Sequence, residues 1–286
     1  MENANDETST AVMSSEDAAF LKQARQMNMP PPAPLYDTIK FKDSEKKIEG
    51  LKRGNYFIES YDGEKKTYRD IGPNPEIVIL HRVYTYSYYK EGEGLKAWTN
   101  DIQGFSENDY VQLYSKKTGM KDPEFSGTYK QFKMYAAQNY TAHGVDGTAE
   151  KLLSFQNLLY VLFEGTVYRM FVSNASTAGI APGERGGDFK NPQPLSLLHF
   201  IETTREKPGK AMCEYVCKLG SYFKDDVEQP FYIRTFENVG DNPDTPTVVP
   251  MVKKILMDAS KLQREIEETC NISQVREVMN TEVIDA

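Results

Sequence analysis

The sequence predicts a β-rich α+β fold, in which a small barrel or sandwich carries insertions and a helix follows it. Short segments rich in β-branched and aromatic residues recur from about residue 50 to residue 240, separated by Gly, Pro, Asn and Asp, as strands and turns are. Residues 248–270 instead place apolar side chains at every third or fourth position, which is the period of an amphipathic helix. A chain of 286 residues also buries enough surface to fold without disulfides or a metal.

Composition divides the chain into three predicted parts. Residues 1–34 form a flexible tail, with a short amphipathic helix at residues 14–27 and a stiff proline-rich linker at residues 30–34. Residues 35–245 form the β-rich domain, and residues 246–286 form a C-terminal helical segment. The apolar stripe of that helix, from Val252 to Ile266, is expected to pack on the β domain or to form a partner contact.

The first strands are predicted between residues 55 and 89. Residues 55–61 and 65–69 form a hairpin, because Asp62 and Gly63 between them are a two-residue turn signal. Residues 76–89 form the strongest predicted strand, since they are rich in β-branched and aromatic residues and follow a turn-forming segment at residues 72–75.

Later elements follow the same signals. Residues 110–114, 129–135 and 158–163 are predicted strands, residues 148–153 are expected to open a helical turn, and residues 166–172 fit either state. Residues 179–188 read as a loop and residues 195–201 as a short helix. Residues 212–223 and 229–239 form a predicted long hairpin with its tip at residues 224–228.

Charge and hydropathy exclude several classes of protein. A net charge of −8 and a pI near 5.2 argue against a protein that binds nucleic acid by bulk charge. No apolar run approaches the ~20 residues of a membrane helix, and the acidic start lacks the apolar segment of a secretory signal. Three cysteines cannot form a disulfide framework, which favours a reducing compartment. The predicted location is the cytoplasm.

Signatures of catalysis and of metal binding are absent from the sequence. It contains no nucleophile-elbow, zinc-protease or Walker-type motif, and its three histidines lie far apart. Cys213 and Cys217 lack zinc spacing, and four residues apart on a strand they are expected to be buried as small apolar groups. Gly183 to Gly187 resembles a phosphate-binding turn but reads as a mobile connection. The sequence therefore predicts no enzymatic activity, no metal and no cofactor.

Tyrosine dominates the aromatic composition, with eighteen Tyr and fourteen Phe against one Trp. Aromatic and basic residues alternate along several predicted strands, and alternate residues of a strand share one face. Single-stranded nucleic acid is bound by stacking its bases on such rings while Lys and Arg contact its phosphates. The candidate binding residues are Arg82, Tyr84, Tyr86, Tyr88, Lys90, Tyr129, Lys130, Lys133, Tyr135, Tyr232, Arg234 and Phe236. The alternative is that these tyrosines line an ordinary, half-exposed sheet.

The sequence leaves open which face the row of Tyr84, Tyr86 and Tyr88 occupies. Val83 forms a plausible core row with Ile79 and Ile77, which would turn the tyrosines outward. Val78 and Leu80 share the tyrosine face by simple alternation, which would turn it inward.

Several segments are arranged as in one known group of proteins. They are residues 54–58 (Gly-Asn-Tyr-Phe-Ile), the strand at residues 77–81, residues 163–166 (Phe-Glu-Gly-Thr), the helix at residues 195–201 and the hairpin segment at residues 230–236. Their order over residues 50–240 resembles phage-encoded single-stranded-DNA-binding proteins with an OB-type core. The resemblance implies an OB-like barrel, a role in phage or plasmid replication or recombination, and single-stranded DNA and replication or recombination proteins as partners.

Two other functions remain open. A virion or assembly protein without nucleic-acid binding would use the tyrosines in its core and interfaces, and the C-terminal helix is a candidate homo-oligomer contact. A metal-dependent nuclease would require a cluster of carboxylates that the sequence alone does not reveal.

Overall fold

The structure is a computed structural model. It describes residues 36–43, 48–61, 65–90, 92–104, 106–118, 122–143, 149–181, 184, 186–205, 211–226 and 230–282. The predicted N-terminal tail, with its short helix and proline-rich linker, lies outside these residues, as does the turn at Asp62 and Gly63.

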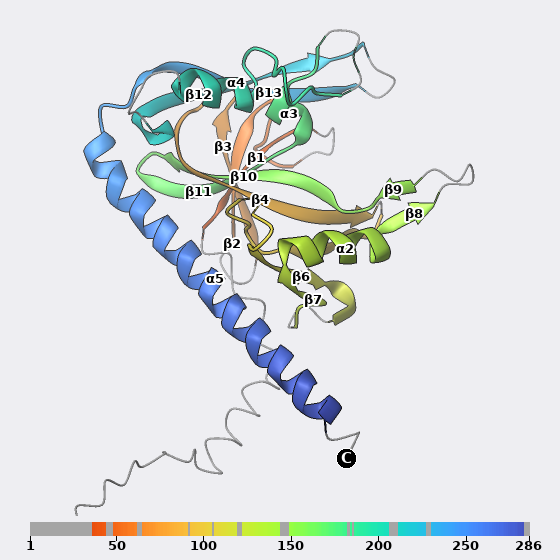
Figure 1. Cartoon of the computed structure of the whole chain (residues 1–286). Helices are drawn as coiled ribbons and strands as arrows, with labels where there is room; N and C mark the ends of the chain where they lie inside the picture. The colour runs from red at the N-terminus through yellow and green to blue at the C-terminus, as the bar shows by residue number, and fades with distance from the viewer. Residues whose placement is uncertain are drawn as a thin grey trace, which may run out of the picture. The chain divides into compact units, whose positions relative to one another are not determined.

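The described residues form strands, four α-helices and two short 3-10 turns (Figure 1). The strands are β1 (Thr38–Phe41), β2 (Tyr56–Tyr61), β3 (Lys66–Gly72), β4 (Glu76–Lys90), β5 (Gly94–Thr99), β6 (Tyr110–Ser115), β7 (Phe125–Thr128), β8 (Thr141–His143), β9 (Ala149–Lys151), β10 (Ser154–Phe163), β11 (Thr166–Val172), β12 (Tyr215–Lys224) and β13 (Phe231–Asp241). The helices are α2 (Tyr129–Asn139), α3 (Asn174–Ala178), α4 (Leu197–Arg205) and α5 (Thr245–Glu282), and the 3-10 turns are η1 (Lys116–Thr118) and η2 (Met212–Glu214).

Eleven of the described strands form one mixed sheet. Its order is β3-β2-β1-β11-β10-β4-β5-β6-β7, and the β12–β13 hairpin joins it at the start of β4. Strands β1 and β11 run parallel, whereas the other described pairs are antiparallel. Among the described residues no pairing joins β3 to β7, so the sheet is open. The β-rich α+β prediction is confirmed, but the described strands do not close into the predicted barrel.

The longest strand, β4, explains why the sheet branches. It pairs with β10 along one side, and on the other side with β12 at its start and with β5 at its end. Its β-branched and aromatic residues suit the extended backbone over its full length of 15 residues. The β12–β13 hairpin and strands β5, β6 and β7 thus join the sheet at opposite ends of β4.

Three clusters of buried side chains surround β4 and its neighbours. The first packs the sheet against α4 and the β12–β13 hairpin, and includes Ile79, Leu159, Phe200 and Phe236. The second packs β5, β6 and the far end of β4 against α2, which lies beside them in Figure 1. The third joins β4 to α5. Helices α2, α4 and α5 are therefore held by the apolar faces that they turn to the sheet.

Residues 129–135, predicted as a strand, belong instead to helix α2. The backbone N–H of Thr128 donates to the Gln131 side chain at 2.8 Å, and the N–H of Gln131 donates to the Thr128 hydroxyl at 3.4 Å. This capping box starts the helix. Tyr129, Phe132 and Ala136 then recur at helical spacing and pack in the second cluster. The prediction was wrong because the alternation of polar and apolar residues was given more weight than the capping signal.

Residues 149–151, expected to open a helical turn, form strand β9. They pair with β8, so a neighbouring strand rather than local preference sets their conformation. The predictions of strands at residues 55–61, 76–89, 110–114 and 158–163 are confirmed, and residues 166–172 are a strand. The long hairpin, the short helix near residue 200 and the C-terminal helix are confirmed as well.

Cys213 and Cys217 are both buried free thiols, but they do not share a strand. Cys213 lies in the 3-10 turn η2, and Cys217 lies in β12. Burial raises the pKa of both thiols, which keeps them protonated. Each cysteine therefore acts as a small apolar side chain, in the third and in the first cluster respectively.

Candidate nucleic-acid interface

The predicted row of Tyr84, Tyr86 and Tyr88 lies on the face of β4 that packs against the second cluster. The Tyr84 ring stacks on Phe155 at a centroid distance of 5.3 Å. The Tyr86 ring meets Phe132 of α2 edge to face at 5.2 Å. The three rings are partly buried, so the row packs beneath α2 and does not line an open groove.

A β-bulge decides the face of this row. Tyr160 of β10 pairs with His81, but the next residue, Val161, pairs with Ile79, so Leu80 is an extra residue in β4. The extra residue shifts the alternation of side chains between the two faces of β4 by one position. The three tyrosines therefore lie on the same face as Ile79, and Val83 lies on the opposite face. The expectation that Val83 shares a core row with Ile79 is therefore wrong, because one inserted residue exchanges the faces.

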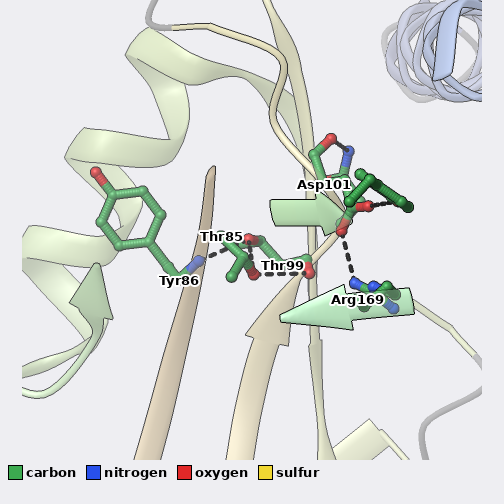
Figure 2. Close-up of polar contacts among 7 residues, drawn as sticks. Thr85, Tyr86, Thr99, Asp101 and Arg169 are labelled. Atoms are coloured by element: carbon green, nitrogen blue, oxygen red, sulfur yellow. Dashed lines mark hydrogen bonds and ion pairs between the residues drawn. The ribbon is translucent and has the colours of Figure 1, made fainter. Parts of the chain in front are cut away.

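Tyr86 is held at both its ring and its backbone. Its hydroxyl shares a hydrogen bond of 2.8 Å with the Tyr129 hydroxyl, and its N–H donates to the Thr99 hydroxyl at 3.0 Å. Figure 2 shows the ring pointing away from the polar contacts around Thr85 and Thr99. Burial, and then the contact with Tyr129, raise the pKa of Tyr86 well above its ordinary value.

Asp101 fastens the chain that follows β5 to the neighbouring strands. Its carboxylate accepts a hydrogen bond from the Tyr160 hydroxyl. It accepts a second from the Arg169 guanidinium, at 3.0 Å (Figure 2). The adjacent Gln103 side chain bonds the His81 ring at 2.8 Å. These contacts connect the segment that follows β5 to strands β4, β10 and β11.

Three of the predicted phosphate-binding cations are engaged within the protein. Arg82 donates to the Asn157 side chain at 2.7 Å, and its guanidinium lies 5.0 Å from the centre of the Tyr84 ring. Arg234 donates to the Phe171 carbonyl at 2.6 Å, and burial lowers the pKa of its guanidinium. Lys90 pairs with Glu93.

The two lysines of α2 are exposed, in contrast. The ammonium of Lys133 lies 5.0 Å from the centre of the Tyr129 ring, within the range of a cation–π contact. Lys130 is exposed as well. Of the predicted cations, Lys90 is exposed too, but it is paired with Glu93.

The remaining predicted aromatics differ widely in exposure. Tyr135 donates to the Glu124 carboxylate at 2.8 Å, and burial together with this contact raises the pKa of Tyr135 to about 12. Phe236 is 1% exposed in the first cluster, so it offers no surface to a base. Tyr232 is half-buried near the tip of the β12–β13 hairpin.

A pocket of about 260 Å³ opens beside α2. We call it the α2 pocket; it is lined by Tyr86, Phe132, Lys133, Ala136, Ala137, Tyr140, Thr141, Lys151 and Leu153. It joins α2 to β4, β8 and β9, so residues distant in the sequence meet there. Both lysines are exposed, and no carboxylate is among the described lining residues.

A second aromatic surface lies near the tip of the β12–β13 hairpin. We call it the hairpin platform, formed by Arg53, Phe223 and Tyr232. The Arg53 guanidinium lies 5.7 Å from the centre of the Phe223 ring and 5.5 Å from that of Tyr232. The two rings pack at 5.0 Å, and Phe223 is 44% exposed. A cation thus lies over two rings, one of which is partly exposed.

The platform depends on contacts between distant segments. Phe223 and Tyr232 are cross-strand partners in the hairpin, and Arg53 arrives from the chain before β2. Gly54 has φ of 87°, a left-handed conformation that favours glycine, and it turns the chain directly after Arg53. The Arg53 side chain also donates to the Asp43 carbonyl at 3.0 Å.

Sequence reasoning included Tyr86, Lys133 and Tyr232 but missed Lys151, Arg53 and Phe223. Lys151 was missed because residues 148–153 were expected to be helical. Phe223 was available as an aromatic at the predicted hairpin tip, which was a usable signal. No local feature of the sequence pointed to Arg53, because the rings that it contacts are about 170 residues away in the sequence.

Neither a metal-binding cluster nor a membrane-spanning helix is found among the residues that the structure describes. No group of three or more His, Cys, Asp or Glu side chains there is arranged to hold a metal ion. No helix in that part of the chain is long and apolar enough to cross a bilayer.

Comparison of the chain with protein-family models, with curated proteins and with solved structures finds no match.

Proposed function

We propose that this protein binds single-stranded DNA without catalysing a reaction, and that it acts in the cytoplasm during phage or plasmid replication or recombination. The observation that carries the proposal is the hairpin platform, in which the Arg53 guanidinium lies over the partly exposed Phe223 ring. Base stacking on such a ring contributes about 1–3 kcal/mol per base and tolerates any sequence.

The platform combines both requirements of strand binding in one place. Phe223 offers ring surface to a base, and Arg53 brings positive charge to the phosphates beside that base. The packing of Phe223 on Tyr232 holds the ring in place before a strand arrives, which lowers the entropy cost of binding. A closed OB barrel is not required, because the rings are presented by a hairpin.

The exposed lysines of α2 support the same proposal. Lys130 and Lys133 lie on a helix that covers the tyrosine row, and Lys133 is held over an aromatic ring. The tyrosine row itself supports the helix from below.

The test is fluorescence anisotropy of labelled oligo-dT at two salt concentrations. We expect binding at low salt and a steep loss of affinity at high salt, since bound phosphates release counterions. Replacing Phe223 with Ala should weaken binding by about 1–3 kcal/mol, the value of one lost stack. The melting temperature should change little, because the ring is 44% exposed.

Tyr89→Ala is the matched control. Tyr89 is 65% exposed at the end of β4, and no cation lies over its ring among the described residues. Its removal should leave affinity unchanged. Absence of oligo-dT binding at low salt would refute the proposed function. Equal losses of affinity in both variants would show that the hairpin platform is not part of the binding site.

One observation favours an assembly protein as the second candidate. Leu256, Met257 and Leu262 of α5 are 42%, 72% and 39% exposed, and exposed apolar residues on one helix can form an interface with a partner. A stable oligomer in light scattering, together with no binding of oligo-dT, would favour this candidate.

A further inference from the structure

We propose that the α2 pocket receives one unstacked base of the bound strand, and that Lys133 and Lys151 contact the phosphates on either side of that base. This inference rests on the proposed function and assigns it a second contact site, separate from the residues of the hairpin platform. The occupant is a single nucleotide unit of the strand.

The size of the pocket suits one small planar group. Its volume of about 260 Å³ lies just below the range of about 300–1,000 Å³ typical of pockets for drug-sized ligands. The space exists because two neighbouring positions of α2, Ala136 and Ala137, carry only methyl groups. Larger side chains at these positions would fill it.

The walls favour stacking over recognition of a particular base. Tyr86, which is partly buried, and Tyr140, which is 7% exposed, line the pocket with aromatic surface, whereas Phe132 at 1% exposed adds little. The Tyr86 hydroxyl is already bonded to Tyr129, and the Tyr140 hydroxyl donates to Glu124 at 3.1 Å. Because these polar ends are used inside the protein, ring surface is what they offer to a ligand. Such a site accepts any base.

Charge complementarity identifies the ligand as anionic. Lys133 comes from α2 and Lys151 from β9, so two separate elements place exposed ammonium groups in the lining. Neither lysine has a carboxylate partner among the described lining residues. A base flanked by phosphates satisfies both the aromatic walls and the two cations.

The first experiment fills the pocket. Ala137→Leu adds three carbon atoms at a lining position of α2, and Gln138→Leu places the same side chain at the next residue, which is exposed and outside the lining. Affinity for oligo-dT should fall about 5- to 150-fold for Ala137→Leu, which corresponds to one lost stack. It should stay unchanged for Gln138→Leu, and both variants should melt with the parent.

The second experiment removes the bases from the ligand. An abasic oligonucleotide of equal length retains the phosphates but has no base to enter the pocket. Ala137→Leu and the parent should therefore bind the abasic strand equally. A similar loss of affinity for both strands would show that leucine acts through the phosphates or the fold, and would overturn the inference.

The third experiment tests the cations. Lys151→Gln should reduce the slope of log affinity against log salt by about 0.7, the value for one phosphate contact with a single strand. Lys253→Gln on α5, also exposed, should leave the slope unchanged. If the parent protein binds oligo-dT but Ala137→Leu binds equally well, the pocket is not a base site and the proposed function stands. If the parent does not bind at all, both proposals fail.

Discussion

Several tyrosines of this protein are buried with a hydrogen-bond partner for the phenol hydroxyl. Tyr56, fully buried, donates to the Gly220 carbonyl at 2.7 Å. Tyr135 donates to Glu124, and Tyr86 shares its hydrogen bond with Tyr129. A buried hydroxyl without a partner costs about 1–3 kcal/mol, so these bonds determine where a tyrosine can replace a phenylalanine.

Removing one such hydroxyl should therefore have a local and measurable cost. Tyr86→Phe keeps the ring against Phe132 but loses the bond to Tyr129, and we expect the free energy of unfolding to fall by about 0.5–1.5 kcal/mol. Urea denaturation measures this change. Tyr88→Phe is the control, since the Tyr88 hydroxyl makes no hydrogen bond among the described residues and its loss should be nearly neutral. Equal effects of the two substitutions would contradict the role given to the Tyr86–Tyr129 bond.

Helix α5 has one face that is buried against the sheet and one face that is exposed. Val248 and Ile255 are 0% and 4% exposed and pack with Val78 and Leu80 of β4. Met257, only two residues after Ile255, is 72% exposed. This difference in exposure follows from helical spacing, because residues two apart on a helix face different directions. The stripe from Val252 to Ile266 was expected to pack on the β domain or to form a partner contact, and packing on the β domain is observed for Val252 and Ile255. Leu256 and Leu262 of the same stripe are exposed.

The contribution of α5 to stability should depend on its buried face. Ile255→Ala removes a buried side chain from the contact with β4, so we expect the free energy of unfolding to fall by about 2–5 kcal/mol. Met257→Ala removes an exposed side chain from the same helix and should change it by less than about 0.5 kcal/mol. Thermal or urea denaturation distinguishes the two. If Ile255→Ala is as stable as Met257→Ala, α5 does not stabilise the β domain.

In the described part of the chain the sheet is the common support of all three buried clusters. Strand β4 contributes Ile79 to the first, packs Tyr86 against the second and contributes Leu80 to the third. Burial is also the first cause of the raised pKa of Tyr56, Tyr86 and Tyr160. Because these tyrosines lie on three different strands, their pKa values depend on the fold as a whole.

Alkaline pH should therefore unfold the protein. An unfolded tyrosine loses its proton near pH 10, whereas folded Tyr135 retains it to about pH 12. Between these values the folded state binds more protons than the unfolded state, so the free energy of unfolding falls as pH rises. Far-ultraviolet circular dichroism and phenolate absorbance should change together in this range.

Tyr135→Phe provides the control for that titration. Its free energy of unfolding should decline less steeply above pH 10, because one raised pKa has been removed. Complete ionisation of the tyrosines near pH 10 in a protein that remains folded would contradict the assignment.

Local sequence was sufficient for the elements whose signals lie within them. Strand β4 is rich in β-branched and aromatic residues, the β12–β13 hairpin has polar residues at its tip, and α5 has a helical apolar stripe. These features act through backbone preference and periodicity, which need no distant partner. Helix α2 was also within reach, because the capping box of Thr128 and Gln131 is a local signal.

Tertiary structure alone decided the faces and the sites. The extra residue at Leu80 is visible only when β10 pairs with β4, and it moves the tyrosine row onto the face that α2 covers. Lys151 reaches the α2 pocket because β9 pairs with β8, and Arg53 reaches Phe223 across the fold. The physical reason is that strand register and burial depend on residues far apart in the chain, whereas propensity and periodicity depend on neighbours.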